Sequence, residues 1–355
     1  MKLENTDFTR KKSQVERKKD KLKDIGKAED VWKQQSGSAD EIALLYVAFA
    51  RAAGLTVWPM KVVNRNRALF DSSYLSTYQL DDYIVIVELG GKEVYLDPGQ
   101  KMCPYGAMHW KHSLATGFKL KPKQTIVAMT PGVTYKSAAV RRIANLVIDE
   151  SGGMKGTIRV EMTGPEALHW RQLALENDEE EAEKQFIESM RDLLPEGVQA
   201  DFDRIQALDD DSANLIAFVK VSGNLGSVTG KRFFLPGLFF ASRAKHPFVA
   251  QDKRIVPIDV HYGKLEQDEV SYSLPPGFNV ESAPQDVNIA WPDHAQLKIH
   301  SSAINGSVTI LRAMAFNFET LDPKEYSNLH DFFLKVAAAD QQQLVLTRAP
   351  AAKGN

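Results

Sequence analysis

The strongest helix pattern of the chain lies in residues 36–55, SGSADEIALLYVAFARAAGL. Ser38 followed by Glu41 forms a capping box, and Gly54 supplies a left-handed residue of the kind that ends a helix. Between these ends the apolar residues recur every three or four positions, which is the period of one helix face. They are Ile42, Leu45, Tyr46, Phe49, Ala50 and Ala53. The pattern predicts a helix that begins at or next to Ser38.

Three strand-like stretches follow this helix and predict an antiparallel sheet. They are LTVWPMKVV (55–63), YIVIVEL (83–89) and KEVYLDP (92–98), the last two joined by Gly90-Gly91 as a hairpin turn. Polar loops cover residues 64–82 and 98–110, and such loops commonly rim a cleft. We therefore expect a helix packed on an antiparallel sheet with a cleft beside it.

Beyond about residue 131 the pattern changes to alternating strands punctuated by Gly, Pro and Asp, as in a β-sandwich. Two helices interrupt them. The first begins in the acidic turn 178–184, and we expect it to bury Phe186, Ile187, Met190 and Leu193. The second begins at DPKE (322–325), and its apolar face is Tyr326, Leu329, Phe333, Val336 and Ala337. The predicted fold class is α+β, with a β-rich, sandwich-like second domain.

These patterns divide the chain into four parts. Residues 1–33 form a charged leader helix with a weak apolar stripe between Thr9 and Lys33, and residues 34–135 form the helix-and-sheet domain. Residues 136–348 form the β-rich domain, and residues 349–355 form a disordered tail. Acidic residues interrupt the basic run of the leader, which argues against a nucleic-acid-binding arm.

Composition excludes several classes of protein. The net charge of −2 argues against a nucleic-acid-binding or membrane-surface protein, and the single cysteine excludes an intrachain disulfide and a Cys-rich zinc module. No apolar run follows the basic N-terminus, so we expect no signal peptide, no membrane insertion and a soluble chain. We predict no cofactor, and the oligomeric state stays open.

The order of helix, strand and strand from Gly37 to Pro98 resembles the core of the transglutaminase-like superfamily, which is related to papain. The family motif is G-x-C-x-[DE] at the start of a helix that ends in RAAG. This chain has GSADE at residues 37–41 and RAAG at residues 51–54. The resemblance implies a cysteine at the helix start, a histidine on the next strand and an aspartate on the following strand.

Two of these three positions lack the chemistry that the family uses. Ala39 stands at the nucleophile position, Tyr83 stands at the histidine position, and only Asp97 matches. A tyrosine with its high pKa is a poor base at neutral pH. Because no histidine occurs between Ser38 and Asp97, we interpret Asp97 as a residue that bonds its own turn at the end of a strand. The resemblance thus implies a degenerate triad and a pseudoenzyme.

Other nucleophiles and a metal site remain as alternatives. Ser38 lies beside the nucleophile position, but its hydroxyl is expected to cap the helix. Cys103 lies in the loop after Asp97, on a different element from the family's nucleophile. Cys103, His109 and His112 form a C-x5-H-x2-H run, yet closed zinc sites use four ligands with stricter spacing. We therefore predict no metal at this run.

Three hypotheses follow for function. The first is a binding or scaffolding module for a peptide, a protein or a cell-envelope partner, with a cleft lined by Ser38, Trp58, Asp82, Cys103 and Trp110. The second is a hydrolase or acyl-transferase that uses Ser38 or Cys103 as a non-standard nucleophile. The third is a purely structural module of a larger envelope protein, in which the β-rich domain provides the partner surface.

The resemblance extends into the second half of the chain. LPPGFNVE (274–281) and DPKEY (322–326) are similar to the C-terminal β-domain of a bacterial family of unknown function. That family couples an N-terminal β-sandwich, a transglutaminase-like middle domain and this C-terminal domain. Its members usually carry an export signal on the N-terminal part, which this chain lacks. The resemblance therefore implies a periplasmic location, and the sequence itself leaves the location open.

Overall fold

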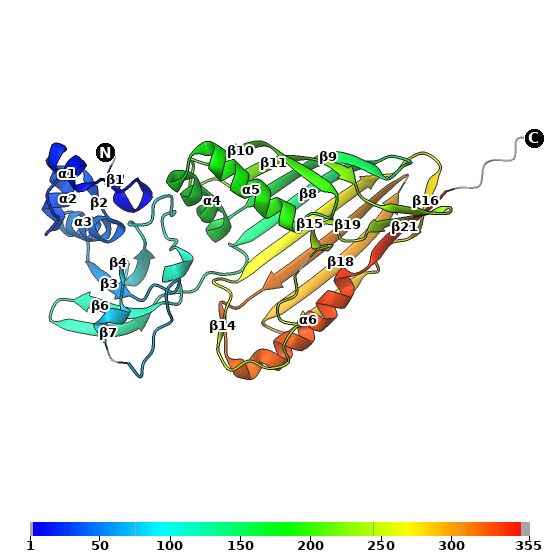
Figure 1. The fold of residues 1–355 in the computed structure, drawn as a ribbon. Helices are drawn as coiled ribbons and strands as arrows, with labels where there is room; N and C mark the ends of the chain where they lie inside the picture. The colour runs from blue at the N-terminus through cyan, green and yellow to red at the C-terminus, as the bar shows by residue number, and fades with distance from the viewer. Residues whose placement is uncertain (1–2, 75, 244, 305, 349–355) are drawn as a thin grey trace, which may run out of the picture. The chain divides into compact units, whose positions relative to one another are not determined.

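The computed structural model describes residues 3–74, 76–243, 245–304 and 306–348 (Figure 1). The chain divides into two compact units. Unit 1 comprises residues 1–133, 167–178 and 208–213, and unit 2 comprises residues 134–166, 179–207 and 214–355. Several sheets together with helices confirm the α+β, β-rich fold class. The predicted disordered tail, residues 349–355, lies outside the described residues.

Unit 1 is built around a five-stranded antiparallel sheet in the order β5-β4-β3-β6-β7. Its strands are β3 (Val57–Val62), β4 (Asp82–Leu89), β5 (Lys92–Leu96), β6 (Thr116–Lys121) and β7 (Gln124–Met129). Its helices are α1 (Gln14–Lys19), α2 (Ala28–Gln34) and α3 (Ala39–Ala52), with 3₁₀ turns η1 (Thr6–Phe8), η2 (Thr77–Gln79) and η3 (Trp110–His112). A small parallel pair joins β1 (Glu4–Asn5) to β2 (Ser36–Gly37).

The predicted ends of α3 are confirmed. Ser38 Oγ accepts a hydrogen bond from the Glu41 N–H at 3.3 Å, and a Glu41 carboxylate oxygen accepts one from the Ser38 N–H at 2.8 Å. Gly54 follows the helix with a φ of +81°, a conformation that costs a side-chain-bearing residue energy. The predicted hairpin between β4 and β5 is also confirmed, because Gly90 and Gly91 both have positive φ.

The apolar residues of α3 make two separate contacts, one with the sheet and one with α2. Ala43, Val47 and Ala50 pack on a core cluster of sheet residues, which are Val57, Val85, Val87 and Leu96. Phe49 remains 45% exposed, and its ring meets the ring of Trp32 on α2 edge to face at 5.1 Å. The small residues therefore face the sheet and the large aromatic residue faces α2.

Two parts of unit 1 differ from the sequence prediction. The prediction of a single leader helix was wrong, because α1 and α2 are short and separated. Lys21 lies between them with a φ of +53°, a backbone conformation that cannot continue a helix. None of the residues of α1 is buried, so the sparse apolar stripe does not support a longer helix. The β6–β7 hairpin was not predicted, and it completes the sheet beyond β3.

Unit 2 contains an eight-stranded sheet in the order β10-β11-β9-β8-β15-β19-β18-β17, in which only the β8–β15 pair is parallel. The strands are β8 (Ala139–Ile148), β9 (Gly153–Met162), β10 (Val198–Gln206), β11 (Leu215–Asn224), β15 (Lys264–Ser273), β17 (Val287–Trp291), β18 (Ala295–Ile304) and β19 (Ser307–Phe316). A four-stranded sheet comprises β12 (Ser227–Thr229), β13 (Arg232–Pro236), β21 (Gln343–Arg348) and β16 (Phe278–Ser282), and a small pair comprises β14 (Ile258–Asp259) and β20 (Thr320–Leu321).

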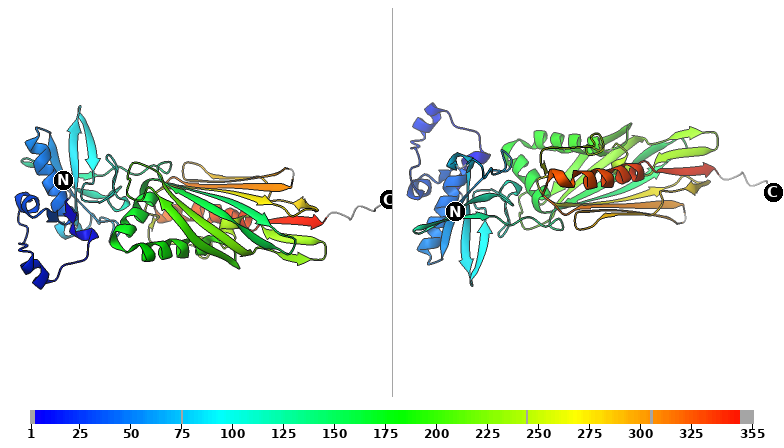
Figure 2. Two further views of the ribbon diagram at one scale, coloured as in Figure 1. Left: turned by 90° about the horizontal axis from the view of Figure 1, so that it is seen from above. Right: turned by 90° about the horizontal axis from the view of Figure 1, so that it is seen from below.

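Helices α5 (Glu179–Leu193) and α6 (Tyr326–Asp340) lie on one face of the large sheet, with the 3₁₀ turns η4 (Phe239–Ala241) and η5 (Pro323–Glu325) beside them. The turned views show α6 lying along the long strands (Figure 2). Both helices were predicted; α5 buries Phe186, Ile187 and Met190, whereas Leu193 is only half-buried. Helix α4 (Gly164–Glu176) was not predicted. Within the described residues, no helix combines the length and the apolar character that a membrane crossing needs.

Ser38 and Ser13 provide a matched pair of helix caps for a stability test. Ser13 and Glu16 form the same capping box on α1, but α1 buries no residue. We expect Ser38→Ala to lower the free energy of unfolding of unit 1 by about 1 kcal/mol, because it removes a cap from a helix that packs on the sheet. Ser13→Ala should leave it unchanged.

Urea unfolding followed by tryptophan fluorescence measures this effect, since Trp32, Trp58, Trp110 and Trp170 all belong to unit 1. Equal effects of the two substitutions would contradict the view that α3 anchors this unit.

Candidate functional site

The N-terminus of α3 is closed by other parts of unit 1. The N–H of Ala39 donates a hydrogen bond to the Asp7 carboxylate at 2.9 Å, and the side-chain amide of Asn5 donates one to the Gly99 carbonyl at 2.8 Å. A Cβ atom on Gly99 would lie 2.3 Å from the Ala39 carbonyl oxygen, so only glycine permits this approach. The chain's own carboxylate therefore occupies the place where a helix N-terminus favours an anion.

The start of β4 is held against the start of α3. A carboxylate oxygen of Asp40, the second residue of α3, accepts a hydrogen bond from the Tyr83 N–H at 2.7 Å. Burial is the main cause that raises the pKa of Asp40, and the nearby charge of Asp82 adds to it. The phenol ring of Tyr83 is partly buried against the core cluster under α3.

A buried imidazole joins the start of β4 to the end of β5. His112 Nδ1 lies 2.7 Å from an Asp97 carboxylate oxygen, and His112 Nε2 lies 2.8 Å from an Asp82 carboxylate oxygen. Asn64 donates a further hydrogen bond to Asp82 at 2.9 Å, and Lys111 stands 3.7 Å from it. We call Asp82, His112 and Asp97 the ionic triad.

The ionic triad holds His112 as a cation at neutral pH. Burial alone would lower its pKa, but the charge of Asp97 and the hydrogen bonds to Asp82 and Asp97 outweigh burial and raise the pKa of His112 to about 9. The same imidazolium lowers the pKa of Asp82, although burial opposes this shift. An imidazole with both nitrogens engaged has no free lone pair to accept a proton from a nucleophile.

The sequence-based interpretation of Asp97 was wrong. The Asp97 carboxylate binds His112 and also accepts a hydrogen bond from the His109 N–H at 3.0 Å. In the turn that follows β5, only the backbone carbonyl of Asp97 accepts a hydrogen bond, from the Gln100 N–H. His112 was considered only as part of the C-x5-H-x2-H run and not as a partner of Asp97, because the family pattern places the histidine before the aspartate. The usable signal was that two carboxylates next to buried strands need a cation, and His112 follows within the next loop.

Cys103 does not behave as a ready nucleophile. Within the described residues its thiol makes no hydrogen bond, and burial, followed by the charges of Asp97 and Asp211, raises its pKa far above the usual range. His109 nearby in sequence is neutral, because burial, followed by the charges of Lys111 and His112, lowers its pKa to about 3. Its Nδ1 accepts a hydrogen bond from the Lys111 N–H at 3.2 Å.

The remaining predicted site residues occupy different environments. Ser38 is the cap of α3, as expected. Trp58 is 6% exposed and packs in a core cluster with Met60, so it belongs to the interior rather than to an open cleft. Trp110 begins η3 and is half-buried. Within the described ranges, no group of three or more His, Cys, Asp and Glu side chains is arranged to hold a metal ion.

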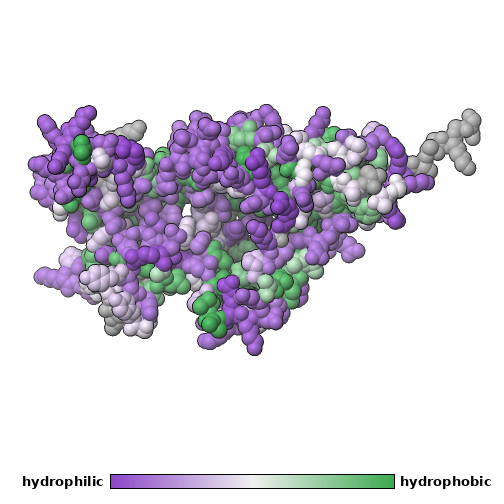
Figure 3. Space-filling view, viewed as in Figure 1, coloured by the Kyte–Doolittle hydropathy of each residue, from purple (hydrophilic) through white to green (hydrophobic). Residues whose placement is uncertain are grey.

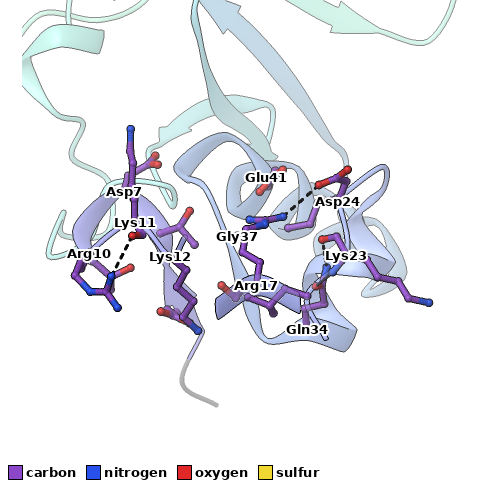
Figure 4. Close-up of a pocket in the computed structure, with 16 residues that line it drawn as sticks. Asp7, Arg10, Lys11, Lys12, Arg17, Lys23, Asp24, Gln34, Gly37 and Glu41 are labelled. Atoms are coloured by element: carbon purple, nitrogen blue, oxygen red, sulfur yellow. Dashed lines mark hydrogen bonds and ion pairs between the residues drawn. The ribbon is translucent and has the colours of Figure 1, made fainter. Parts of the chain in front are cut away.

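A hollow of about 450 Å³ lies beside the start of α3 (Figure 4). Its lining includes Gly37, Glu41 and Asp7 together with basic residues of the N-terminal segment. Several of these basic residues are already paired: Arg17 lies 3.2 Å from Asp24, and the other pairs are Lys12–Asp20 and Arg10–Glu16. The hollow is thus polar and internally neutralised rather than an apolar substrate pocket.

In comparisons with known proteins, a family model matches only part of the chain. Residues 231–346 match the model of a domain of unknown function for which a structure has been solved, DUF3858. This confirms the resemblance of the second half to a domain of unknown function, and both LPPGFNVE and DPKEY fall inside the match. No curated protein matches the sequence.

Among solved structures, the chain is similar to a "putative protease" from Parabacteroides distasonis, with 13% sequence identity and a TM-score of 0.45. The alignment covers 91% of this chain and 46% of that chain, so the present chain spans less than half the length of that protein. A similarity this low says nothing about activity.

The ionic triad predicts a pH-dependent stability of unit 1. A histidine whose pKa is about 9 when folded and 6.5 when unfolded stabilises the fold fully below pH 6.5 and loses this contribution as the pH rises through 9. His112→Gln should remove this dependence and lower the free energy of unfolding near pH 6.5 by roughly 3 kcal/mol, because two buried carboxylates lose their cation.

His300 supplies the control, because it forms an exposed pair with Asp286 at 3.0 Å in unit 2. His300→Gln should change stability little at either pH. Urea unfolding by tryptophan fluorescence at pH 6.5 and pH 9 is the measurement. A wild-type stability that does not fall between these pH values would show that His112 is not charged in the fold.

Proposed function

We propose that residues 34–135 form a transglutaminase-like domain that has lost its catalytic chemistry, and that the chain acts as a binding or scaffolding module of the bacterial cell envelope. The observation that carries this proposal is the state of His112, whose two ring nitrogens are both held by carboxylates. In this arrangement the imidazole serves as a buried cation and not as a base.

The convergence of three elements supports the correspondence with the family. Ala39 at the start of α3 touches Gly99, two residues after Asp97, and Asp40 is bonded to the backbone of Tyr83. The three positions that the family would use, on α3, β4 and the end of β5, are therefore neighbours in unit 1. Their side chains are a methyl group, a phenol and a carboxylate.

The groups around the nucleophile position argue further against covalent chemistry. The N–H of Ala39, which could stabilise a thiolate in a family member, is bonded to Asp7. An additional negative charge from Asp40 lies within the same turn of helix. A thiolate or an oxyanion formed here would meet carboxylates rather than free donors.

A second candidate function is a hydrolase or acyl-transferase that uses Cys103. The observation in its favour is that Cys103 and His109 lie in the loop that binds Asp97. Burial opposes it, because the raised pKa of the thiol leaves almost no thiolate at neutral pH. Ser38 is a weaker candidate, since its oxygen is engaged in the cap of α3.

We expect the wild-type chain to show no thiol-dependent turnover. Cys103 should react with iodoacetamide at pH 7 more slowly than free cysteine, because its thiol is buried and protonated. Hydrolysis of a fluorescently labelled casein should be equal for the wild type and Cys103→Ser. Fast labelling together with turnover that is lost in Cys103→Ser would establish the second candidate function and overturn the first.

The family correspondence can be tested by restoring the missing groups. In a Cys103→Ser and Asp7→Ala background, which frees the N–H of residue 39, Ala39→Cys with Tyr83→His should give a thiol whose pKa is below the usual 8.5, because the helix start and an imidazolium both favour the thiolate. The matched control is Ala52→Cys at the other end of α3, where the helix dipole favours the protonated thiol.

The pKa of each thiol is read from the pH dependence of its rate of iodoacetamide labelling. If Cys at position 39 titrates no lower than Cys at position 52, the correspondence with the family's nucleophile position fails.

A further inference from the structure

A cavity of about 380 Å³ lies on the inner face of the large sheet in unit 2. It is within the size range of pockets that hold small organic ligands. Aromatic side chains form much of its wall, and α6 and the segment 245–248 close two of its sides. These aromatic residues are Phe240, Phe248, Phe316, Phe318 and Phe333. In the space-filling view, apolar residues come to the surface beside α6 and β14 (Figure 3).

Charged residues lie at the floor of this cavity and directly beneath it, where the inner face of a sheet is ordinarily apolar. Arg142 on β8, Asp268 on β15 and Arg312 on β19 are directly paired in register, and each is at most 9% exposed. Along the same face of β15 the next two inward positions are Glu266 and Lys264. Buried charges cost free energy and are often replaceable by apolar residues, so folding alone does not explain this row.

Arg142 has hydrogen-bonding capacity that the protein does not use. Its Nε donates to Asp268 at 2.6 Å, and its Nη2 lies 3.7 Å from Glu266, beyond hydrogen-bond distance. No hydrogen bond to its Nη groups is found within the described residues, although the side chain is 93% buried and lines the cavity. Asp268 fixes the guanidinium from one side, and the Cζ atom of Arg142 lies 5.3 Å from the centroid of the Phe240 ring.

Positively charged side chains outnumber carboxylates in the lining of the cavity. Four lining side chains carry a permanent positive charge, and two carry a carboxylate. The positively charged residues are Arg142, Lys245, Lys264 and Arg312, and the carboxylates are those of Glu266 and Asp340. Both lining carboxylates are already bound: Asp340 by Arg312 through two hydrogen bonds of 2.9 Å, and Glu266 by Lys264 at 2.7 Å.

Asp268 and Glu166 lie behind this lining and neutralise part of its charge. Tyr262 donates its hydroxyl to Glu166 at 2.9 Å, so this lining hydroxyl is also engaged. Although burial would raise it, the charges of Lys264 and Arg142 lower the pKa of Glu266 to about 2, so this carboxylate stays ionised. Selectivity for an anion therefore rests on the unused donors of Arg142 rather than on net charge.

We propose that this cavity binds an amphipathic carboxylate, with its aryl or alkyl part against the phenylalanine wall and its carboxylate on the Nη donors of Arg142. A planar guanidinium held in place by Asp268 matches a carboxylate through two parallel hydrogen bonds. The inference concerns unit 2 alone and goes beyond the proposed function, since it holds whether or not unit 1 performs chemistry.

The test uses the full chain and three probes with one carbon skeleton. They are 4-phenylbutyrate, the uncharged 4-phenylbutan-1-ol and the cationic 4-phenylbutylamine, each titrated by isothermal calorimetry. We expect saturable binding of 4-phenylbutyrate about tenfold tighter than binding of the alcohol, because a charge-assisted pair replaces a neutral hydrogen bond. The amine should bind more weakly than the alcohol.

Arg142→Lys keeps the charge but removes the planar fork, and it should weaken 4-phenylbutyrate binding about tenfold without changing the alcohol. The matched control is Arg141→Lys, the same change on the opposite face of β8, where Arg141 pairs with Glu269 at 2.9 Å. Phe248→Ala should weaken both the carboxylate and the alcohol, because it removes part of the apolar wall.

The circular dichroism spectrum and the Tm of each variant show whether it has folded. Should Arg142→Lys fail to fold, Phe248→Ala and Lys264→Met decide in its place, and both must weaken 4-phenylbutyrate binding. The proposal is overturned if 4-phenylbutyrate shows no saturable binding up to about 1 mM. It is equally overturned if the alcohol binds as tightly as the carboxylate, or if Arg141→Lys weakens binding as much as Arg142→Lys.

Discussion

The contact on which the candidate site depends is the pair of carboxylates on one imidazolium. Asp82 begins β4, Asp97 follows β5, and His112 ends η3, so the ionic triad ties three separate segments of unit 1 together. None of the three groups could be buried as a charge by itself. The attraction between the imidazolium and the carboxylates, with the hydrogen bond of Asn64, stabilises the ionised states of Asp82 and His112.

The ionic triad also decides what this place can do chemically. A catalytic imidazole needs one nitrogen oriented by an acid and the other free to exchange a proton with the nucleophile. Here the second nitrogen is bound to Asp82, the aspartate just before Tyr83. A group that could give a proton to the imidazole is absent from the start of α3 as well, because position 39 carries a methyl group. The ionic triad therefore connects β4, the end of β5 and η3.

The buried charges of unit 2 differ from the ionic triad in their hydrogen-bond partners. In the ionic triad both ring nitrogens of His112 are held by carboxylates, although Asp97 Oδ1 has no partner within the described residues. In unit 2, by contrast, Arg142 donates one hydrogen bond to Asp268, stands 3.7 Å from Glu266 and lines a cavity with an aromatic wall. The imidazole of His112 is thus held on both sides, whereas the Nη groups of Arg142 make no hydrogen bond within the described residues.

Short-range patterns in the sequence determined much of the local structure. The capping box of Ser38 and Glu41, the stop at Gly54 and the Gly90-Gly91 turn depend on neighbouring residues, and all three were predicted. The α+β class and helices α5 and α6 followed from periodicity in the same way. The sequence also established that position 39 has no nucleophile, since this follows from residue identity once the helix start is located.

Only the tertiary structure decided the roles of the ionisable groups. His112 lies 30 residues after Asp82 and 15 after Asp97, and nothing in that spacing shows that its ring stands between their carboxylates. The interpretation that the Asp97 side chain bonds its own turn was wrong for the same reason, because its partner His112 is distant in sequence. The pairing of Arg142 with Asp268 joins residues 126 positions apart through the register of two parallel strands. Charge interactions and hydrogen bonds depend on distances in space. The sequence therefore shows which ionisable groups are present, but their partners depend on the fold.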